Sequence, residues 1–271
     1  MVASRNSEEG GEQLKKTPWS SPVTGNQIED LWNLDSSDIY AVDIVHGLRQ
    51  NRFSYHTHIP LNLLNHSVAV SEYLEERGKD EYTQLAGLLH DAHEAYTGDT
   101  VRPVKILYPE IDDLEMEVQR DIWDSFGIDE PSEELWSGAI DEGDQAVLLL
   151  EADRTMSEPE FLNEIKLYLE DHEVTPEEVM DIGEDIGVSR GREHAKKEFR
   201  DRFEQLMIDV YGPEHLDAHY DSEMMDDYQI PGGINSDLRK KGRDTLLVGA
   251  DKLYHRVRNG MYRSRKSRRE D

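Results

Sequence analysis

A histidine and an aspartate stand side by side at His90-Asp91, within a segment that is otherwise largely apolar. An ionised aspartate in such surroundings is costly unless it meets a cation or takes up a proton. If residues 81–96 form one helix, a narrow polar stripe on it carries Thr83, Gly87, His90 and Glu94, with Asp91 at its edge. We therefore expect this stripe to face a site, and the missing side chain of Gly87 to leave room there for a ligand.

A second histidine, His66, is predicted to face the same interior. Residues 61–77 have the pattern of a helix, because apolar side chains recur at three- and four-residue spacing, and His66 lies on that apolar stripe. A lone inward histidine is more often a hydrogen-bonded core residue than a ligand, but the nearby His90-Asp91 pair favours a ligand. The chain has no cysteine, so disulfides and thiolate catalysis are excluded, and a metal would need histidine nitrogen and carboxylate oxygen.

The elements that would position these residues are helices, and we predict an all-α fold without internal repeats. Apolar periodicity and capping signals predict helices over 39–50, 61–77, 81–96, 111–126, 133–156 and 189–211, with others beginning near 158, 176 and 245. Pro103 is expected to keep residues 100–105 out of the preceding helix. The glycines and prolines of residues 212–240 predict an irregular connection.

Composition divides the chain into four parts. Residues 1–24 are predicted to be a disordered or loosely attached lead-in, and residues 25–156 hold the candidate site. Residues 157–245 are an acidic helical extension, expected to pack on the core or to form the interface of a homo-oligomer. Residues 246–271 are a terminal helix with a basic tail. This tail leaves nucleic acid open as a partner, although a solvated tail is the favoured interpretation.

The charge balance is strongly acidic. The formal net charge is -29, from 59 acidic and 30 basic residues. Because only 11 of the basic residues are lysine, the composition resembles that of proteins from salt-saturated cytoplasm, where screening removes the self-repulsion. We predict a halophilic host or its virus, with an ordinary acidic cytosolic protein as the alternative. No segment has the length and apolar content of a signal peptide or membrane span, so we expect a cytoplasmic protein without a membrane partner.

The order and spacing of these residues resemble the HD-domain metal-dependent phosphohydrolases. His66, then His90-Asp91, then a distant aspartate follow the pattern of that family. The segment His90 to Asp99, reading HDAHEAYTGD, and the following Arg102-Pro103-Val104-Lys105 resemble the branch containing bacterial 5'-deoxynucleotidases. Related phage-type proteins, including deoxynucleoside triphosphate hydrolases, are similar. Arg52-Phe53, His56-Thr57 and Asn65-His66-Ser67 match that branch as well. The resemblance covers residues 36–156 and implies an HD-domain helical bundle carrying a C-terminal helical extension.

The resemblance implies one divalent metal. The ligands it implies are His66, His90, Asp91 and Asp144. Asp141 and Asp153 compete with Asp144, which is preferred because Gly143-Asp144 before an apolar run, with Glu151 seven residues later, is similar to the family's final motif. Such a nitrogen and oxygen site suits Mn²⁺, Co²⁺, Fe²⁺, Zn²⁺ or Ni²⁺, with Mg²⁺ also compatible.

The resemblance also implies roles around the metal. Glu94 occupies the position of the general acid or base, Arg52 that of the residue meeting the substrate phosphate, and Asp99 that of a residue near the sugar hydroxyl. Arg102 and Lys105 would reach the phosphates or remain solvated surface cations. Three further aromatic residues lie close to these in the sequence: Phe53, His56 and His93.

Phe53 would stack on the sugar or plug the core, and His56 would contact the substrate. We interpret His93 as a packing or supporting residue rather than a ligand of a second metal. The function implied is hydrolysis of a small-molecule nucleotide by a 5'-deoxynucleotidase. A deoxynucleoside triphosphate triphosphohydrolase and a non-catalytic nucleotide-binding regulator are the alternatives.

Overall fold

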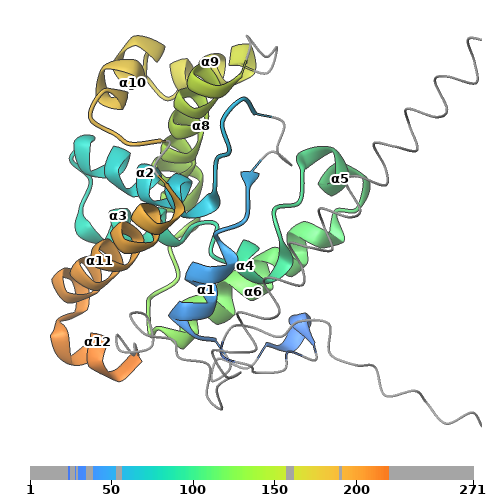
Figure 1. The fold of residues 1–271 in the computed structure, drawn as a ribbon, viewed down its shortest axis with the longest axis vertical. Coiled ribbons are helices and arrows are strands. Elements are labelled where there is room, and N and C mark those ends of the chain that lie inside the picture. The colour runs from blue at the N-terminus through green and yellow to red at the C-terminus, as the bar shows by residue number, and fades with distance from the viewer. Residues whose placement is uncertain are drawn as a thin grey trace, which may run out of the picture. The chain divides into compact units, whose positions relative to one another are not determined.

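The computed structural model describes residues 24, 28, 30–34, 39–52, 57–156, 162–188 and 191–219, with side chains through residue 216. In these ranges the protein is helical and has no β-sheet (Figure 1), which confirms the predicted all-α class. An isolated antiparallel β-bridge joins Asn51 to Asn62. The predicted lead-in before residue 24 and the predicted terminal helix and tail, residues 246–271, lie outside the described residues.

The described helices follow one another with short connections. In chain order they are η1 (Leu31–Asn33), α1 (Ala41–Gly47), α2 (Leu63–Glu76), α3 (Glu81–Leu89), α4 (Glu94–Thr97), α5 (Arg102–Leu107), α6 (Glu110–Ser125), α7 (Glu133–Leu135), the π-helical turn η4 (Trp136–Ile140), α8 (Asp141–Thr155), α9 (Leu162–Asp171), α10 (Pro176–Gly183), α11 (Arg192–Tyr211) and α12 (Pro213–His219). The predicted helix over 133–156 thus contains a π-helical turn before α8.

Helix α2 lies at the centre of this arrangement, because it packs against α3, α8 and α11. Its side chains enter both buried apolar clusters: Leu63, Leu64 and Val68 join the first, and Val70 and Leu74 join the second. The second cluster also takes buried residues from α8, α9 and α10. The helices after residue 156 therefore pack on those that carry the predicted ligands.

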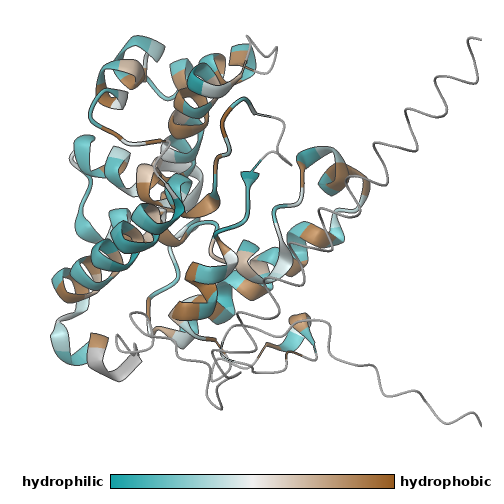
Figure 2. Ribbon diagram, viewed as in Figure 1, coloured by the Kyte–Doolittle hydropathy of each residue, from teal (hydrophilic) through white to brown (hydrophobic). Residues whose placement is uncertain are grey.

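Helix α11 covers α2 and α3 with a narrow apolar stripe. This helix, which was predicted over residues 189–211, is mostly hydrophilic (Figure 2). Its buried side chains recur at three- and four-residue spacing: Ala195, Phe199, Phe203, Leu206 and Met207. On the polar side of this contact, Arg202 donates to the Ser71 hydroxyl at 2.6 Å and to the Ser71 carbonyl at 2.9 Å. The apolar stripe and Arg202 thus help to fix this long polar helix to α2 and α3.

The predicted continuous helix over residues 81–96 is wrong. Helix α3 ends at Leu89, and turns follow whose hydrogen bonds join residues three positions apart. The Ala92 N–H donates to the Leu89 carbonyl at 3.0 Å, and the Glu94 N–H donates to the Asp91 carbonyl at 3.0 Å. The physical reason lies in His90. Its ring Nδ1 lies 2.8 Å from the Gly87 carbonyl, so this carbonyl has a side-chain partner in place of the backbone N–H of the next helical turn. The polar stripe expected on one helix is therefore divided between α3 and α4.

Gly87 does not leave room for a ligand, as the sequence had suggested. A Cβ atom on Gly87 would lie 2.3 Å from Leu74 Cδ1 and 3.3 Å from Val70 Cγ1. The missing side chain lets α3 approach α2 closely. Gly87 therefore serves helix packing, one turn before His90.

One prediction about a proline-containing segment needs correction. Residues 100–105 do leave the preceding helix, and residues 102–107 then form the separate short helix α5, with Pro103 in its first turn. Pro213 begins α12 inside the stretch predicted to be irregular. Proline is compatible with a first helical turn, because the amide hydrogen it lacks has no partner there. The capping box at Thr175 is confirmed, with Glu178 as its reciprocal partner, while the start predicted near 158 lies outside the described residues.

No described helix combines the length and the apolar character needed to cross a membrane.

Gly47 marks a close approach between α1 and α4, and its substitution tests that contact. A Cβ atom there would lie 2.6 Å from both Cα and Cβ of Ala95 and 2.7 Å from its carbonyl oxygen. Because the clash involves backbone, we expect Gly47→Ala to lower the free energy of unfolding by about 1–3 kcal/mol, measured by urea denaturation. Gly138→Ala is the control, since its Cβ would meet nothing within 4 Å. Equal stabilities of the two variants would contradict this packing.

Candidate metal centre

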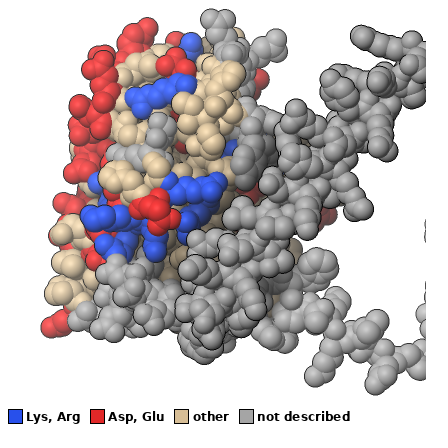
Figure 3. Space-filling model, in the orientation of Figure 1, with Lys and Arg blue, Asp and Glu red and all other residues tan. Residues whose placement is uncertain are grey.

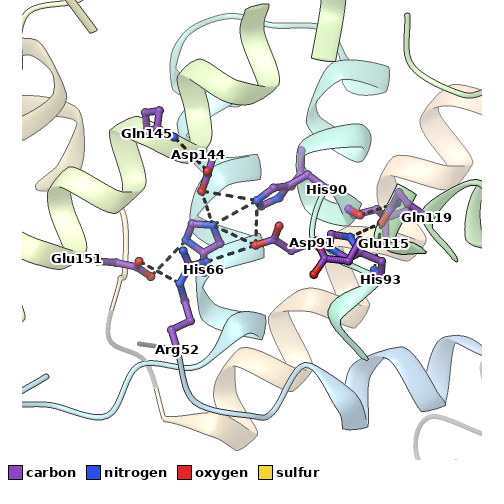
Figure 4. A network of polar contacts seen from close by, with 12 residues as sticks. Arg52, His66, His90, Asp91, His93, Glu115, Gln119, Asp144, Gln145 and Glu151 are labelled. Atoms are coloured by element: carbon purple, nitrogen blue, oxygen red, sulfur yellow. Dashed lines mark hydrogen bonds and ion pairs between the residues drawn. The ribbon is translucent and has the colours of Figure 1, made fainter. Parts of the chain in front are cut away.

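Four predicted ligands converge from three separate parts of the chain (Figure 4). His66 comes from α2, His90 and Asp91 from the turn after α3, and Asp144 from α8. His66 Nε2 lies 2.9 Å from Asp144 Oδ1 and 3.3 Å from His90 Nε2, and His90 Nε2 lies 3.2 Å from Asp91 Oδ2. Both histidines are buried, at 0% and 6% exposure. The structure therefore brings these residues together as a compact donor set.

The outer nitrogen of each imidazole has a partner that directs the inner nitrogen toward the cluster. His90 Nδ1 contacts the Gly87 carbonyl at 2.8 Å, and a carbonyl can only accept, so Nδ1 carries the proton. His66 Nδ1 faces Glu151 Oε1 at 3.4 Å, which favours a proton on that nitrogen as well. Carbonyl and carboxylate partners of this kind fix the tautomer of metal-binding histidines. Both Nε2 atoms are thus oriented as electron-pair donors.

The donor set fits a metal ion. Two ligands about 2.1 Å from one ion and separated by about 90–110° lie about 3.0–3.4 Å apart. Three of the distances within the donor set, 2.9, 3.2 and 3.3 Å, are close to this range, and two others are longer, at 3.7 and 3.8 Å. Two facing imidazole lone pairs repel each other, and a cation between them removes that repulsion. His66, His90 and Asp144 therefore form a buried group able to hold a metal ion.

The pKa values describe what this cluster does with protons. Burial alone would raise the pKa of Asp144, but its hydrogen bonds with His66 and His90 hold it well below its usual value. Burial likewise disfavours a charged His90, yet Asp91 and Asp144 raise the pKa of that imidazole well above its usual value. The carboxylates thus attract positive charge into the cluster, and a metal would compete with a proton for the same nitrogens.

The two competing aspartates lie elsewhere. Asp141 accepts a hydrogen bond from the Tyr168 hydroxyl at 2.5 Å, and Asp153 is exposed. Asp144 is the aspartate of α8 that the structure places beside His66 and His90.

Glu151 is a member of this site to which the sequence analysis gave no role. Its side chain is fully buried, with Oε1 facing His66 Nδ1 and Oε2 lying 3.5 Å from Arg52 Nε. It stands two helical turns after Asp144, so both project from the same side of α8. A charged residue at that spacing, directly after Leu148-Leu149-Leu150, was the signal available in the sequence.

Arg52 lies beside the donor set, where it contacts both Glu151 and Asp91. Its NH1 is 3.5 Å from Asp91 Oδ2. Its backbone N–H donates to the Leu61 carbonyl at 3.1 Å, which ties the segment after α1 to the start of α2. The guanidinium therefore supplies a fixed positive charge beside Asp91. Phe53 and His56, predicted to act close to Arg52, lie outside the described residues.

Glu94 is buried near Asp91, and one of its carboxyl oxygens lacks a hydrogen-bond partner among the described residues. Asp91, His93 and Glu94 offer ligand atoms within 4.8 Å of one another. Burial raises the pKa of Glu94 to about 9, with a further contribution from the negative charge of Asp91. A cation bound beside Asp91 would oppose this shift. Glu94 is thus a carboxyl group able to exchange a proton next to the donor set.

His93 is held by α6. Its Nδ1 contacts Gln119 Oε1 at 3.1 Å, and its Nε2 lies 3.6 Å from Glu115 Oε2. Lys105 pairs with the same Glu115 carboxylate. A cavity of about 170 Å³ beside Asp91 is lined by these four side chains, among others. Lys105 is therefore close to the site, with its charge already paired.

Two other predicted substrate contacts are separate from the donor set. Arg102 is exposed on α5, and in the described part of the chain it makes no contact with the four ligands. Asp99 lines another cavity, together with Arg49 and Arg192.

No protein-family model matches the chain, and no curated protein matches it significantly. Fold and site together define an all-α protein with a buried histidine and aspartate group able to hold a metal ion.

Replacing Glu151 tests its support of the donor set. We expect Glu151→Gln to weaken Co²⁺ binding about 10- to 100-fold, measured by competition with a chromophoric chelator, because the amide no longer attracts the His66 Nδ1 proton. Glu142→Gln is the matched control: Glu142 is also a buried glutamate of α8, but it accepts from Tyr73 and Arg77, each at 3.2 Å. A similar loss in both variants would show that Glu151 acts only through the stability of α8.

Proposed function

We propose that the chain is an HD-domain metal-dependent phosphohydrolase that removes phosphate from a deoxynucleoside monophosphate. The observation that carries this proposal is the convergence of His66 Nε2, His90 Nε2, Asp91 Oδ2 and Asp144 Oδ1 within a buried cluster. The motif from His90 to Asp99, resembling the 5'-deoxynucleotidase branch, supports the substrate class. The proposed cofactor is one divalent transition metal, from the group Mn²⁺, Co²⁺, Fe²⁺, Zn²⁺ and Ni²⁺, or Mg²⁺.

When bound, such an ion polarises a phosphoryl oxygen and lowers the pKa of a coordinated water. The side chains supply the remaining functions. Arg52, fixed beside Asp91, stabilises the negative charge that develops on the phosphoryl oxygens. Glu94, buried next to Asp91, is placed to move a proton.

The proposed reaction forms one bond and breaks one. The water oxygen attacks phosphorus, and the bond between phosphorus and the 5' oxygen of the nucleoside breaks. With a cation beside Asp91 opposing its raised pKa, Glu94 would be ionised, accept a proton from the attacking water and pass that proton to the 5' oxygen as it leaves. The products are orthophosphate and a deoxynucleoside, and no oxidant or second substrate is required.

The state of Lys105 favours a monophosphate over a triphosphate. A triphosphohydrolase needs cations along the phosphate chain, whereas Lys105 is paired with Glu115 and Arg102 is exposed away from the donor set. Release of the whole triphosphate from a deoxynucleoside triphosphate is therefore the second candidate. A nucleotide-binding regulator without turnover is the third.

A hydrolysis assay tests the proposal. The chain loaded with Mn²⁺ or Co²⁺ is incubated with deoxynucleoside monophosphates, ribonucleoside monophosphates and deoxynucleoside triphosphates, and orthophosphate and triphosphate are measured. We expect orthophosphate from the deoxynucleoside monophosphates, loss of activity with EDTA, and loss in Asp144→Asn but not in Asp153→Asn. Triphosphate as the product would select the second candidate. A stoichiometrically metal-bound chain without turnover would select the regulator.

Glu94→Ala separates proton transfer from metal binding. We expect turnover to fall about 10²- to 10⁴-fold, the range associated with a general acid or base, while the metal content measured by mass spectrometry stays unchanged. Glu94→Gln, which preserves the shape of the side chain, should lose turnover as well. Loss of the metal from these variants would instead make Glu94 a ligand.

A further inference from the structure

A second cavity, of about 710 Å³, lies apart from the donor set. It is lined by the end of α1, the segment after it, Asp99 and the first residue of α11: His46, Gly47, Arg49, Gln50, Asn51, Asp99 and Arg192. None of the four predicted metal ligands contributes to its lining. Its volume falls within the usual range of small-molecule sites.

Two guanidinium groups face this cavity with little compensation from carboxylates. Arg192 NH2 donates to Asn51 Oδ1 at 2.7 Å, and within the described ranges it has no ion pair. Arg49 NH2 lies 2.6 Å from Glu193 Oε1, but the Glu193 side chain is 76% exposed. Solvent and salt screen such an exposed pair. Much of the positive charge of the two arginines is therefore available to a ligand.

Asn51 adds a buried donor in need of an acceptor. The residue is only 8% exposed, and its Nδ2 has no hydrogen-bond partner among the described residues. Its Oδ1 is already used by Arg192. A buried N–H group without an acceptor is unfavourable, and a ligand oxygen would satisfy it. The amide and the two guanidinium groups thus call for a ligand rich in acceptor oxygens.

Cationic side chains gather at this cavity although the chain is strongly acidic. On the face drawn in Figure 3, Lys and Arg side chains surround a small acidic group near the middle, a further basic group lies nearer the top, and acidic side chains line the left edge. Burial lowers the pKa of His46, and the charges of Lys196 and Arg49 lower it further, against the opposing effect of Asp43 and Glu193. A chain with a formal net charge of -29 therefore keeps a cluster of cations at this cavity.

We propose that this cavity is a second binding site, separate from the metal centre, for an anion of the phosphate class. Planar guanidinium groups bind phosphate oxygens through paired hydrogen bonds. The N-terminus of α11, where Arg192 is the first residue of a 20-residue helix, adds a partial positive charge. Asp99 is the acidic residue of the lining. The anion is a free phosphate or polyphosphate, or the phosphates of a nucleotide.

The cavity wall is held in place before any ligand arrives. Gln50 Nε2 donates to the Glu94 carbonyl at 2.7 Å, and Gln50 Oε1 accepts from the Asp99 N–H at 3.4 Å. Arg192 is held by Asn51, and the Asn51 backbone pairs with Asn62 at the start of α2. A preformed wall lowers the entropic cost of binding.

Calorimetric titration tests this site without using the metal or any turnover. The full chain, in EDTA and at a fixed salt concentration that preserves its helical circular dichroism, is titrated with inorganic phosphate, tripolyphosphate and a deoxynucleoside triphosphate. We expect one anion per chain, with binding weakened about tenfold or more in Arg192→Gln and in Arg49→Gln. A nucleotide that binds more tightly than tripolyphosphate would identify the nucleotide as the source, and equal binding would identify the polyphosphate.

Two controls assign the site. Arg120→Gln removes an arginine that pairs with Glu117 and Glu130 on α6 and the following segment, and it should leave binding unchanged. Arg52→Gln should also leave binding unchanged, because Arg52 belongs to the metal centre. Absence of saturable binding, or an equal loss in Arg120→Gln, would overturn the proposal. A loss confined to Arg52→Gln would place the anion at the metal centre instead. Because the titration needs no hydrolysis, its outcome is independent of the proposed reaction.

Discussion

The site depends on positive charge to hold several carboxyl groups in one buried space. Asp91, Asp144, Glu151 and Glu94 lie around His66 and His90, and Arg52 is the guanidinium that the described structure places among them. Burying like charges together is unfavourable unless cations or protons compensate them. Burial alone would lower the pKa of Arg52, yet Glu151 and Asp91 raise it. Burial raises the pKa of Glu94, and the negative charge of Asp91 raises it further, so a proton on Glu94 avoids one more negative charge in this space. One divalent cation would compensate two of these negative charges at a single position.

The close packing of helices on α2 is what gives the donor set its small dimensions. Gly87 of α3 and Gly143 of α8 both face Val70 and Leu74 of α2, and a Cβ on Gly143 would lie 3.3 Å from Val70 Cγ1. Val70 and Leu74 follow His66 by one and two helical turns. Each glycine also precedes a predicted ligand closely, His90 in one case and Asp144 in the other. The two glycines therefore bring both neighbouring helices close to the helix that carries His66, and the cost of two flexible residues is offset by a preorganised site.

Sequence periodicity was sufficient for most of the described helices, because apolar stripes and capping residues act locally. It also directed His66 and His90 inward, whereas Asp144 was indicated only by the resemblance to a known family. It failed where a tertiary contact decided the local structure. The histidine bond to the Gly87 carbonyl ends α3 early, and Gly87 packs against a helix that no local pattern relates to it. The role of Glu151 depends on its contact with His66, which lies 85 positions earlier in the chain. Residue types thus indicated what the site contains, whereas the partners of each ligand became apparent only from the three-dimensional arrangement.

For a strongly acidic chain, the proposed binding of anionic ligands sets long-range repulsion against local attraction. The formal net charge of -29 repels any phosphate that approaches through dilute solvent. In the salt-rich cytoplasm that the composition predicts, the screening length falls to about 3 Å at 1 M salt, so distant carboxylates lose their influence. Contacts made by partly buried groups are screened much less. Arg52, at 12% side-chain exposure beside Asp91, belongs to that class. High salt would therefore remove the repulsion while leaving the short-range attraction of Arg52 in place, so an acidic surface is compatible with a phosphate-binding site built around a buried arginine.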